Sequence, residues 1–243
     1  MHMIRKLFLF IISLLFIISV YAQIEKPQNT PVYDRDPLHF GFTLGLSTMD
    51  FGIKMADNFY DLDTVLGINN KRQPGFNIAM VTNLRMGEYF DLRFLPGLVF
   101  GQRDLIYNRD SALVSNNLEE NNRAEHIMKI ESTFLQFPLQ VKYKAVRVNN
   151  YRPYLIAGVN YCYDLEAQKR IKDAERPKIR LKRHDVYWEV GFGVDYYFPF
   201  FKLSSELKFS VGILDVIQPD NREYTNAIDK LNSKMVTLQF HFE

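Results

Sequence analysis

The chain has 243 residues, enough for one domain of ordinary size once a targeting segment is removed. Its formal net charge of +2 gives no global basic field, so the composition does not favour nucleic-acid binding. The single cysteine, Cys162, excludes an internal disulfide framework, a thiolate zinc site and a CxxC redox centre, and a mean hydropathy of −0.19 excludes a polytopic helical membrane protein.

The N-terminal segment has the order of a secretory signal peptide. Arg5 and Lys6 precede an apolar run over 7–20, and tolerable residues then lead to Ala22. We expect cleavage after Ala22, which removes residues 1–22. The run is shorter than the roughly 20 apolar residues that span a bilayer, although an uncleaved anchor is the alternative. The next segment, 23–36, contains prolines and no periodicity, and predicts a flexible, exposed periplasmic lead-in.

Over 37–243 the dominant signal is period-two alternation. Between 186 and 198, apolar and aromatic side chains at even positions alternate with Tyr, Glu, Gly and Asp at odd ones. The predicted strands cover 38–48, 75–85, 88–103, 128–145, 153–163, 185–198, 200–213 and 233–242. Three connections are short and four run to about twenty residues, an alternation typical of outer-membrane barrels. The sequence therefore predicts an all-β, eight-stranded antiparallel up-and-down transmembrane β-barrel with short periplasmic turns and long extracellular loops.

Two prolines interrupt this pattern. Pro138 in the fourth predicted strand cannot donate a ladder hydrogen bond and predicts a bulge, and Pro96 poses the same problem in the third. Either proline could instead break its strand into two.

The two strand faces distinguish a membrane barrel from a soluble, lipocalin-like one. One face is nearly continuous Leu, Val, Ile and Phe, as lipid contact requires, and aromatic residues gather near strand ends. The other face mixes Gly and Ser with both signs of charge, which suits a narrow lumen with paired charges. The charged residues expected in the lumen are Asp91, Arg93, Arg103, Glu189, Asp195, Lys202, Glu206 and Lys208. We expect an integral outer-membrane protein in contact with outer-membrane lipids, with a soluble or periplasmic barrel as the alternative.

Three segments resemble a known family. TFLQFPLQVKYKA at 133–145 and RPYLIAGVNY at 152–161 are similar to the paired motif of the Bacteroidetes outer-membrane β-barrel domain, and PLHFGFTLGLSTMDFGIK at 37–54 resembles the PorT (SprT) family. The resemblance implies a non-enzymatic accessory of the type IX secretion and gliding system, with other secretion components as partners. Because eight strands leave room only for side chains, such a chain would assist a larger translocon. The competing hypothesis is a generic barrel: a small-solute pore, a structural anchor or an adhesion surface.

One predicted outer loop, 164–184, is rich in basic residues. A role for it in binding lipopolysaccharide phosphates or an acidic partner competes with a plain solvated loop. Its basic residues are Lys169, Arg170, Lys172, Arg176, Lys178, Arg180, Lys182 and Arg183.

Motifs for catalysis, metals and cofactors are weak, and we expect none of the three. The residues that favour the enzymatic alternative, an outer-membrane lipid hydrolase, are His126, Ser132, His184 and Asp185, at spacings that are not diagnostic. Three aspartates, at 57, 61 and 63, lack the full pattern of a calcium loop. Cys162 alternates into the lumen, where we expect a structural role.

Overall fold

The computed structural model describes residues 28–31, 33–56, 65–109, 125–167, 179–219, 225 and 227–243. The predicted signal peptide, 1–22, lies outside this part of the chain. None of the helices in the described part is long and apolar enough to cross a membrane.

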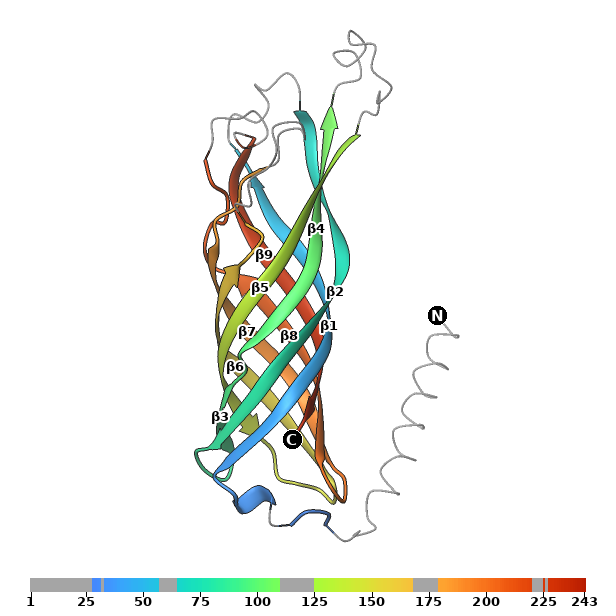
Figure 1. The fold of residues 1–243 in the computed structure, drawn as a ribbon, viewed down its shortest axis with the longest axis vertical. Coiled ribbons are helices and arrows are strands. Elements are labelled where there is room, and N and C mark those ends of the chain that lie inside the picture. Colours follow the sequence, from blue (N-terminus) through green and yellow to red (C-terminus); the bar gives the residue numbers. More distant parts are fainter. Residues whose placement is uncertain are drawn as a thin grey trace, which may run out of the picture.

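The described strands form one antiparallel sheet that closes on itself, with β1 paired to β2 on one side and to β9 on the other (Figure 1). The strands are β1 (Leu38–Met55), β2 (Val65–Arg85), β3 (Phe90–Phe94), β4 (Gly97–Arg109), β5 (Glu125–Lys144), β6 (Tyr151–Asp164), β7 (His184–Tyr197), β8 (Lys202–Gly212) and β9 (Ile228–Phe242). Because β3 and β4 together take one position between β2 and β5, the ring has eight strand positions, which we call staves. The predicted architecture is therefore confirmed.

The break between β3 and β4 comes from two prolines that lie beside each other in the sheet. Leu95 N donates to the carbonyl of Pro138 at 3.2 Å, and Met80 N donates to the carbonyl of Pro96 at 2.9 Å. Neither proline has an N–H to return these bonds, so two ladder bonds are missing at one level. The register of β5 with its neighbours is the same on both sides of the break. Pro96 thus divides its strand, whereas the bulge expected at Pro138 is wrong.

A bulge that the sequence analysis missed lies in β2. The pairing of β2 with β4 shifts by one residue between Arg72 and Phe76, a stretch that contains Pro74. The extra residue bends β2 at the level where its outward side chains change from apolar to polar.

Most strands extend further than predicted toward the end with the long loops. Most of the long connections are therefore shorter than predicted. The four connections are 56–64, 110–124, 165–183 and 213–227, and only 165–183 approaches the expected length. The physical reason lies in the outer ends of the strands, where the alternation inverts. On β1, Met49 and Phe51 point inward and are buried, while Thr48 points outward and is exposed. Because this outer part of each strand has apolar residues inside and polar residues outside, its sequence pattern does not indicate a continuation of the membrane-spanning strand.

The part of the barrel near the short turns, which is the lower part in Figure 1, carries the apolar outer face that lipid requires. On β1 the outward side chains from Leu38 to Leu46 are 42–66% exposed. Exposed aromatic rings encircle the end with the short turns, where Phe42 stacks on Phe242 at 4.9 Å and Phe90 contacts Tyr143 at 5.2 Å. Rings at this position are typical of a membrane interface.

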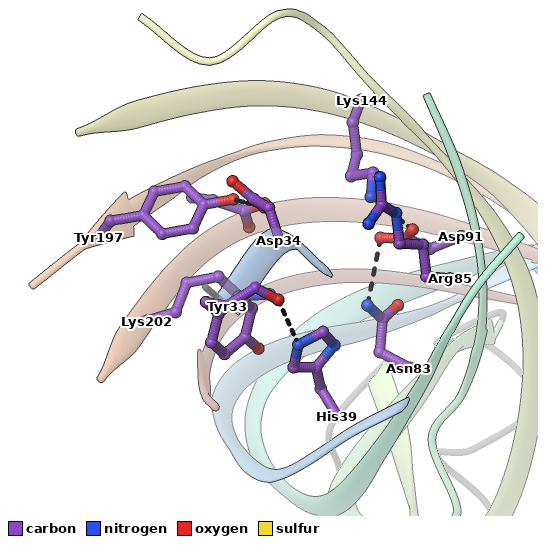
Figure 2. A pocket seen from close by; sticks show the side chains of 10 residues that line it. Tyr33, Asp34, His39, Asn83, Arg85, Asp91, Lys144, Tyr197 and Lys202 are labelled. Carbon is purple, nitrogen blue, oxygen red and sulfur yellow. Dashed lines mark hydrogen bonds and ion pairs between the residues drawn. The ribbon is translucent and has the colours of Figure 1, made fainter. Parts of the chain in front are cut away.

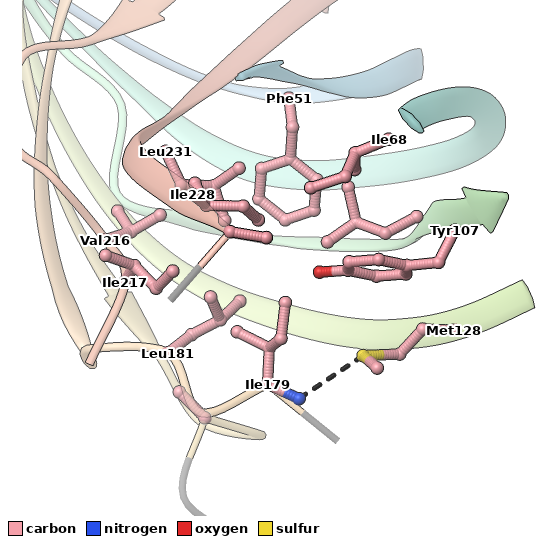
Figure 3. Packing of buried hydrophobic residues seen from close by; sticks show 13 residues of the cluster. Phe51, Ile68, Tyr107, Met128, Ile179, Leu181, Val216, Ile217, Ile228 and Leu231 are labelled. Carbon is pink, nitrogen blue, oxygen red and sulfur yellow. Dashed lines mark hydrogen bonds between the residues drawn. The ribbon is translucent and has the colours of Figure 1, made fainter. Parts of the chain in front are cut away.

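The interior changes character from one end to the other. Charged and amide side chains fill the part near the short turns, and a small cluster that includes Met49, Phe134 and Cys162 lies beyond them. A larger apolar cluster closes the end with the long loops (Figure 3). It joins residues of the strand ends, such as Phe51 and Tyr107, to Leu181 and Ile217 of two connections, which form a β-bridge. We call this cluster the outer cap.

Candidate functional site: the filled lumen and its two ends

The structure places all eight of the charged residues expected in the lumen inside the barrel, each no more than 3% exposed. Each lies on a strand and follows the inward parity of that strand. They form several ionic groups within the lumen, each completed by residues from other strands.

One group is built around Arg93 of β3 and Glu206 of β8. Arg93 Nη1 lies 3.0 Å from Glu206 Oε2, which also accepts a hydrogen bond from the Tyr154 hydroxyl at 2.9 Å. Arg93 Nη2 lies 3.6 Å from Glu243, whose carboxylate also pairs with Lys202 at 2.9 Å. This group joins four staves across the lumen, because β3, β6, β8 and the end of β9 all contribute to it.

A second group pairs Lys142 of β5 with Asp195 of β7. The ammonium of Lys142 lies 2.8 and 2.7 Å from the two carboxylate oxygens and 3.7 Å from the ring centroid of Tyr154. Ser204 donates a further bond to Asp195 at 2.5 Å. With three donated bonds, the Asp195 carboxylate is compensated although water is excluded.

A third group surrounds Glu189 of β7. Lys208 lies 3.2 Å from Oε1, and the side chains of Gln140, Asn160 and Ser210 donate to the same carboxylate at 2.6, 2.9 and 3.0 Å. This carboxylate is therefore saturated and leaves no accessible base for chemistry.

The fourth group lies beneath the outer cap and is built around Arg103 of β4. Its guanidinium donates to Ser132 at 2.6 Å and Ser233 at 2.9 Å, and lies 3.4 Å from Asp164. It also lies over the rings of Phe51, at 4.4 Å, and Phe134, at 5.0 Å. Arg103 thus joins the ionic part of the lumen to its apolar part.

The sequence analysis missed several partners in these groups. Lys142 and Lys144 are buried in the lumen, where Lys144 pairs with Asp91 at 2.5 Å. Alternation could have found them, since Gln136, Gln140, Lys142 and Lys144 share one parity of β5 while apolar residues fill the other. Glu243 follows the last strand and carried no such signal.

The described residues of the lead-in, 28–31 and 33–36, lie at the mouth of the barrel at the end with the short turns (Figure 2). Where the sequence predicted a flexible, exposed segment, Tyr33–Arg35 forms a short 3₁₀ helix, η1, over the lumen. Asp34 accepts a hydrogen bond from Tyr197 at 2.9 Å and pairs with Arg152 at 2.9 Å and Arg147 at 3.3 Å. The sequence alone could not predict these contacts, because the partners of Asp34 are far away in the sequence.

A second set of contacts holds Tyr33 in the mouth. Burial and the adjacent carboxylate of Glu243 both raise the pKa of Tyr33, so its hydroxyl stays protonated and donates to Glu243 at 2.9 Å. The ring stacks on His39 with centroids 3.9 Å apart, and His39 Nε2 lies 2.8 Å from the Tyr33 carbonyl. The lead-in therefore continues the ionic network of the lumen.

Part of the predicted basic loop can be placed. Arg180 and Lys182 are exposed at the outer end, while Arg183 is half-buried and donates to the carbonyl of Ala167 at 3.2 Å and the hydroxyl of Tyr163 at 3.3 Å. The remaining basic residues, Lys169, Arg170, Lys172, Arg176 and Lys178, lie outside the described residues.

The residues weighed for a lipid hydrolase do not converge where the structure describes them. Ser132 and Asp185 are buried inside the barrel, whereas His184 is exposed on the outer face and lies 2.5 Å from the Tyr161 hydroxyl. The side chain of His126 and the aspartates at 57, 61 and 63 lie outside the described part. Within that part, no group of three or more His, Cys, Asp or Glu could hold a metal ion. Cys162 is fully buried.

The best-formed cavities among the described residues each have room for about one water molecule. One lies at the mouth between Asp34 and Lys202, and the other is lined by Asn77, Lys208 and Gln239. Around these two cavities, the described residues fill the lumen with ion pairs near the short turns and with apolar side chains near the long loops.

The closed ring, its apolar outer face and its filled polar lumen define a small outer-membrane β-barrel. The family model described as "Outer membrane protein beta-barrel domain" matches residues 21–218, and the chain belongs to this family. The protein is thus an integral protein of the outer membrane, embedded in its lipids. No curated protein matches the sequence.

Several solved structures are similar to this chain. Neisserial surface protein A has 11% identity and a TM-score of 0.41, with 85% of this chain and 98% of that chain covered. OprG from Pseudomonas aeruginosa has 12% identity and a TM-score of 0.43, with 85% and 92% covered. The attachment invasion locus protein Ail of Yersinia pestis, in complex with the heparin analogue sucrose octasulfate, has 10% identity and a TM-score of 0.38, with 85% and 98% covered. Since these TM-scores are below 0.5, the fold assignment depends on the strand pairing and the family match.

The Lys142–Asp195 pair can be tested by a double-mutant cycle. We expect Lys142→Met and Asp195→Leu each to lower the free energy of unfolding by about 3–5 kcal/mol, because each leaves one charge buried without its partner. The double variant should recover most of this loss. The measurement is urea unfolding of the barrel refolded into lipid vesicles. Additive losses in the double variant would show that the two groups do not interact.

The contacts of Asp34 predict that one substitution loosens the hold of the barrel on the lead-in. In Asp34→Ala, Arg147, Arg152 and Tyr197 each lose one acceptor, and backbone amides of 28–36 should exchange with deuterium at least about tenfold faster. The barrel should still show the gel mobility of the folded form. The matched control is Asp36→Ala, since Asp36 is exposed. Equal exchange in both variants would contradict the assigned role of Asp34.

Proposed function

We propose that this protein is a sealed, non-enzymatic outer-membrane barrel that acts through the surfaces it presents on either side of the membrane. The observation that carries this proposal is the continuous filling of the lumen, from Asp34 at the mouth through the ionic groups to the outer cap. A barrel filled in this way can hold its loops, turns and lead-in at fixed positions.

The proposal disfavours one version of the generic barrel, the small-solute pore. A conducting lumen needs polar side chains that line a hydrated path, whereas Arg93, Lys142 and Glu206 are fully buried against their partners. The other two versions, a structural anchor and an adhesion surface, both agree with a sealed lumen.

Single-channel recording in a planar bilayer tests the seal. We expect the refolded protein to give no stepwise conductance in 1 M KCl, under conditions in which a trimeric porin gives clear steps. Retention of the folded form in the bilayer is checked by its heat-modifiable mobility on a gel. Reproducible steps from the folded protein would overturn the proposal.

We further propose a more specific role, as an accessory of the type IX secretion and gliding system. Support comes from the segments at 37–54, 133–145 and 152–161 and from their similarity to the PorT family. They form most of β1, the lower half of β5 and most of β6. A sealed lumen fits this role only if cargo passes through another protein, so the partners are other secretion components.

Cargo location in a strain that lacks the gene tests the secretion role. We expect type IX cargo to accumulate in the periplasm and to return to the culture medium on complementation, as followed by immunoblot of both fractions. A control cargo of another secretion route should be released normally. Normal release of type IX cargo from the deletion strain would refute the secretion role and leave the sealed barrel untouched.

A further inference from the structure

Three lysines gather on the outer face of the barrel where β1 meets β9. Lys54 lies directly opposite Lys230 in the register, and Lys234 lies four residues further along β9 on the same face, opposite Asp50. All three are exposed, while their neighbours Ile53, Leu231 and Met235 point inward. We call Lys54, Lys230 and Lys234 the seam lysines.

The space between the seam lysines is kept open by a glycine. Gly52 lies opposite Asn232 in the centre of the three. A Cβ atom at position 52 would come within 2.8 Å of Cε and 3.2 Å of Nζ of Lys234. The chain of Lys234 therefore lies across Gly52, and its ammonium points into the centre of the group.

The charges of the seam lysines are only partly compensated. Lys54 pairs with Asp229 at 2.6 Å. Asp50 faces Lys234, but it is paired with Arg72 at 2.9 Å on its other side and also accepts a bond from Asn70. In the described part of the chain, neither Lys230 nor Lys234 has a carboxylate within ion-pair distance. Like charges directly opposite each other on one face of a sheet are unfavourable, so an anion between them would be stabilising.

The apolar face that contacts lipid begins immediately below. Val236 follows Lys234 on the outward side of β9 and is 36% exposed, and the pair Leu46 and Leu238 continues it at 64% and 41%. The seam lysines therefore lie at the level where lipid headgroups meet water, at the end of the barrel with the long loops. A ligand with both acyl chains and an anionic headgroup would contact both surfaces at once.

We propose that the seam lysines bind a phosphate of a glycolipid in the outer leaflet, with the acyl chains of that lipid on Val236, Leu238 and Leu46. This inference rests on the location in the outer membrane and is independent of the secretion role. The site differs from the basic loop 164–184, because it is built on two paired strands and has a fixed geometry.

The test is the affinity of the detergent-solubilised barrel for bisphosphorylated lipid A, measured by native mass spectrometry or thermophoresis. The double variant Lys230→Gln/Lys234→Gln should bind at least about tenfold more weakly. Gly52→Ala retains every charge but displaces the Lys234 ammonium, and should also weaken binding. Lys129→Gln on β5 is the matched control, because it removes an exposed charge on another face, and should bind as the unchanged protein does. All four proteins should show the folded gel mobility.

Three results would overturn the proposal. Equal affinity of the double variant and the Lys129→Gln control would exclude the seam lysines. Equal affinity for lipid A from which both phosphates have been removed would show that the acyl chains alone drive binding. Inorganic pyrophosphate that binds as tightly as lipid A, with the same loss in the double variant, would assign the group to a soluble anion.

Discussion

Closure of the sheet is the constraint on which the rest of this structure depends. A strand in hydrocarbon has no water to satisfy its backbone, so every edge must find a partner, and here the last edge is closed by the long ladder between β1 and β9. Closing only eight staves makes the interior narrow enough for side chains to fill. Any charge inside then loses contact with water, so the lumen must be an assembly of compensated pairs such as Lys142 with Asp195.

The alternation of side chains was sufficient to predict the number of staves and the eight lumen charges, because a period of two reports directly which face each residue occupies. It could not predict the partners. Arg93 meets Glu206 from a stave that is not its neighbour, and such contacts depend on the stagger of the closed ring, which no local pattern encodes. The contacts of the lead-in could not be predicted for the same reason, since Asp34 pairs with Arg152, which is far away in the sequence. The bulge near Pro74 was missed because the inverted pattern above it hid the continuation of β2.

The two ends of the barrel are closed by different physical means. At the mouth, the lead-in adds charges and rings to the ionic network, and Asp34 joins η1 to Arg147 and Arg152 beside the turn between β5 and β6 and to Tyr197 at the end of β7. At the other end, Leu181 and Ile217 from two connections pack on strand residues in a dry apolar cluster. A polar seal can rearrange through exchange of hydrogen-bond partners, whereas an apolar seal must expose surface to open. The proposed lipid contact of the seam lysines lies just outside the second seal.

The ion pairs that cross the lumen also affect how the protein reaches the membrane. Arg93 of β3 and Glu206 of β8 lie on opposite sides of the ring, with three strands between them in the sheet, so they meet only when the sheet curls round the lumen. An intermediate with half its staves inserted would hold unpaired ammonium and carboxylate groups in or near hydrocarbon, at a cost that grows with each stave added. Insertion in steps is therefore disfavoured relative to insertion of a nearly closed ring. The side chains that fill the finished lumen thus favour folding in which the whole ring closes together, and assembly factors that hold the strands together until the ring closes would assist it.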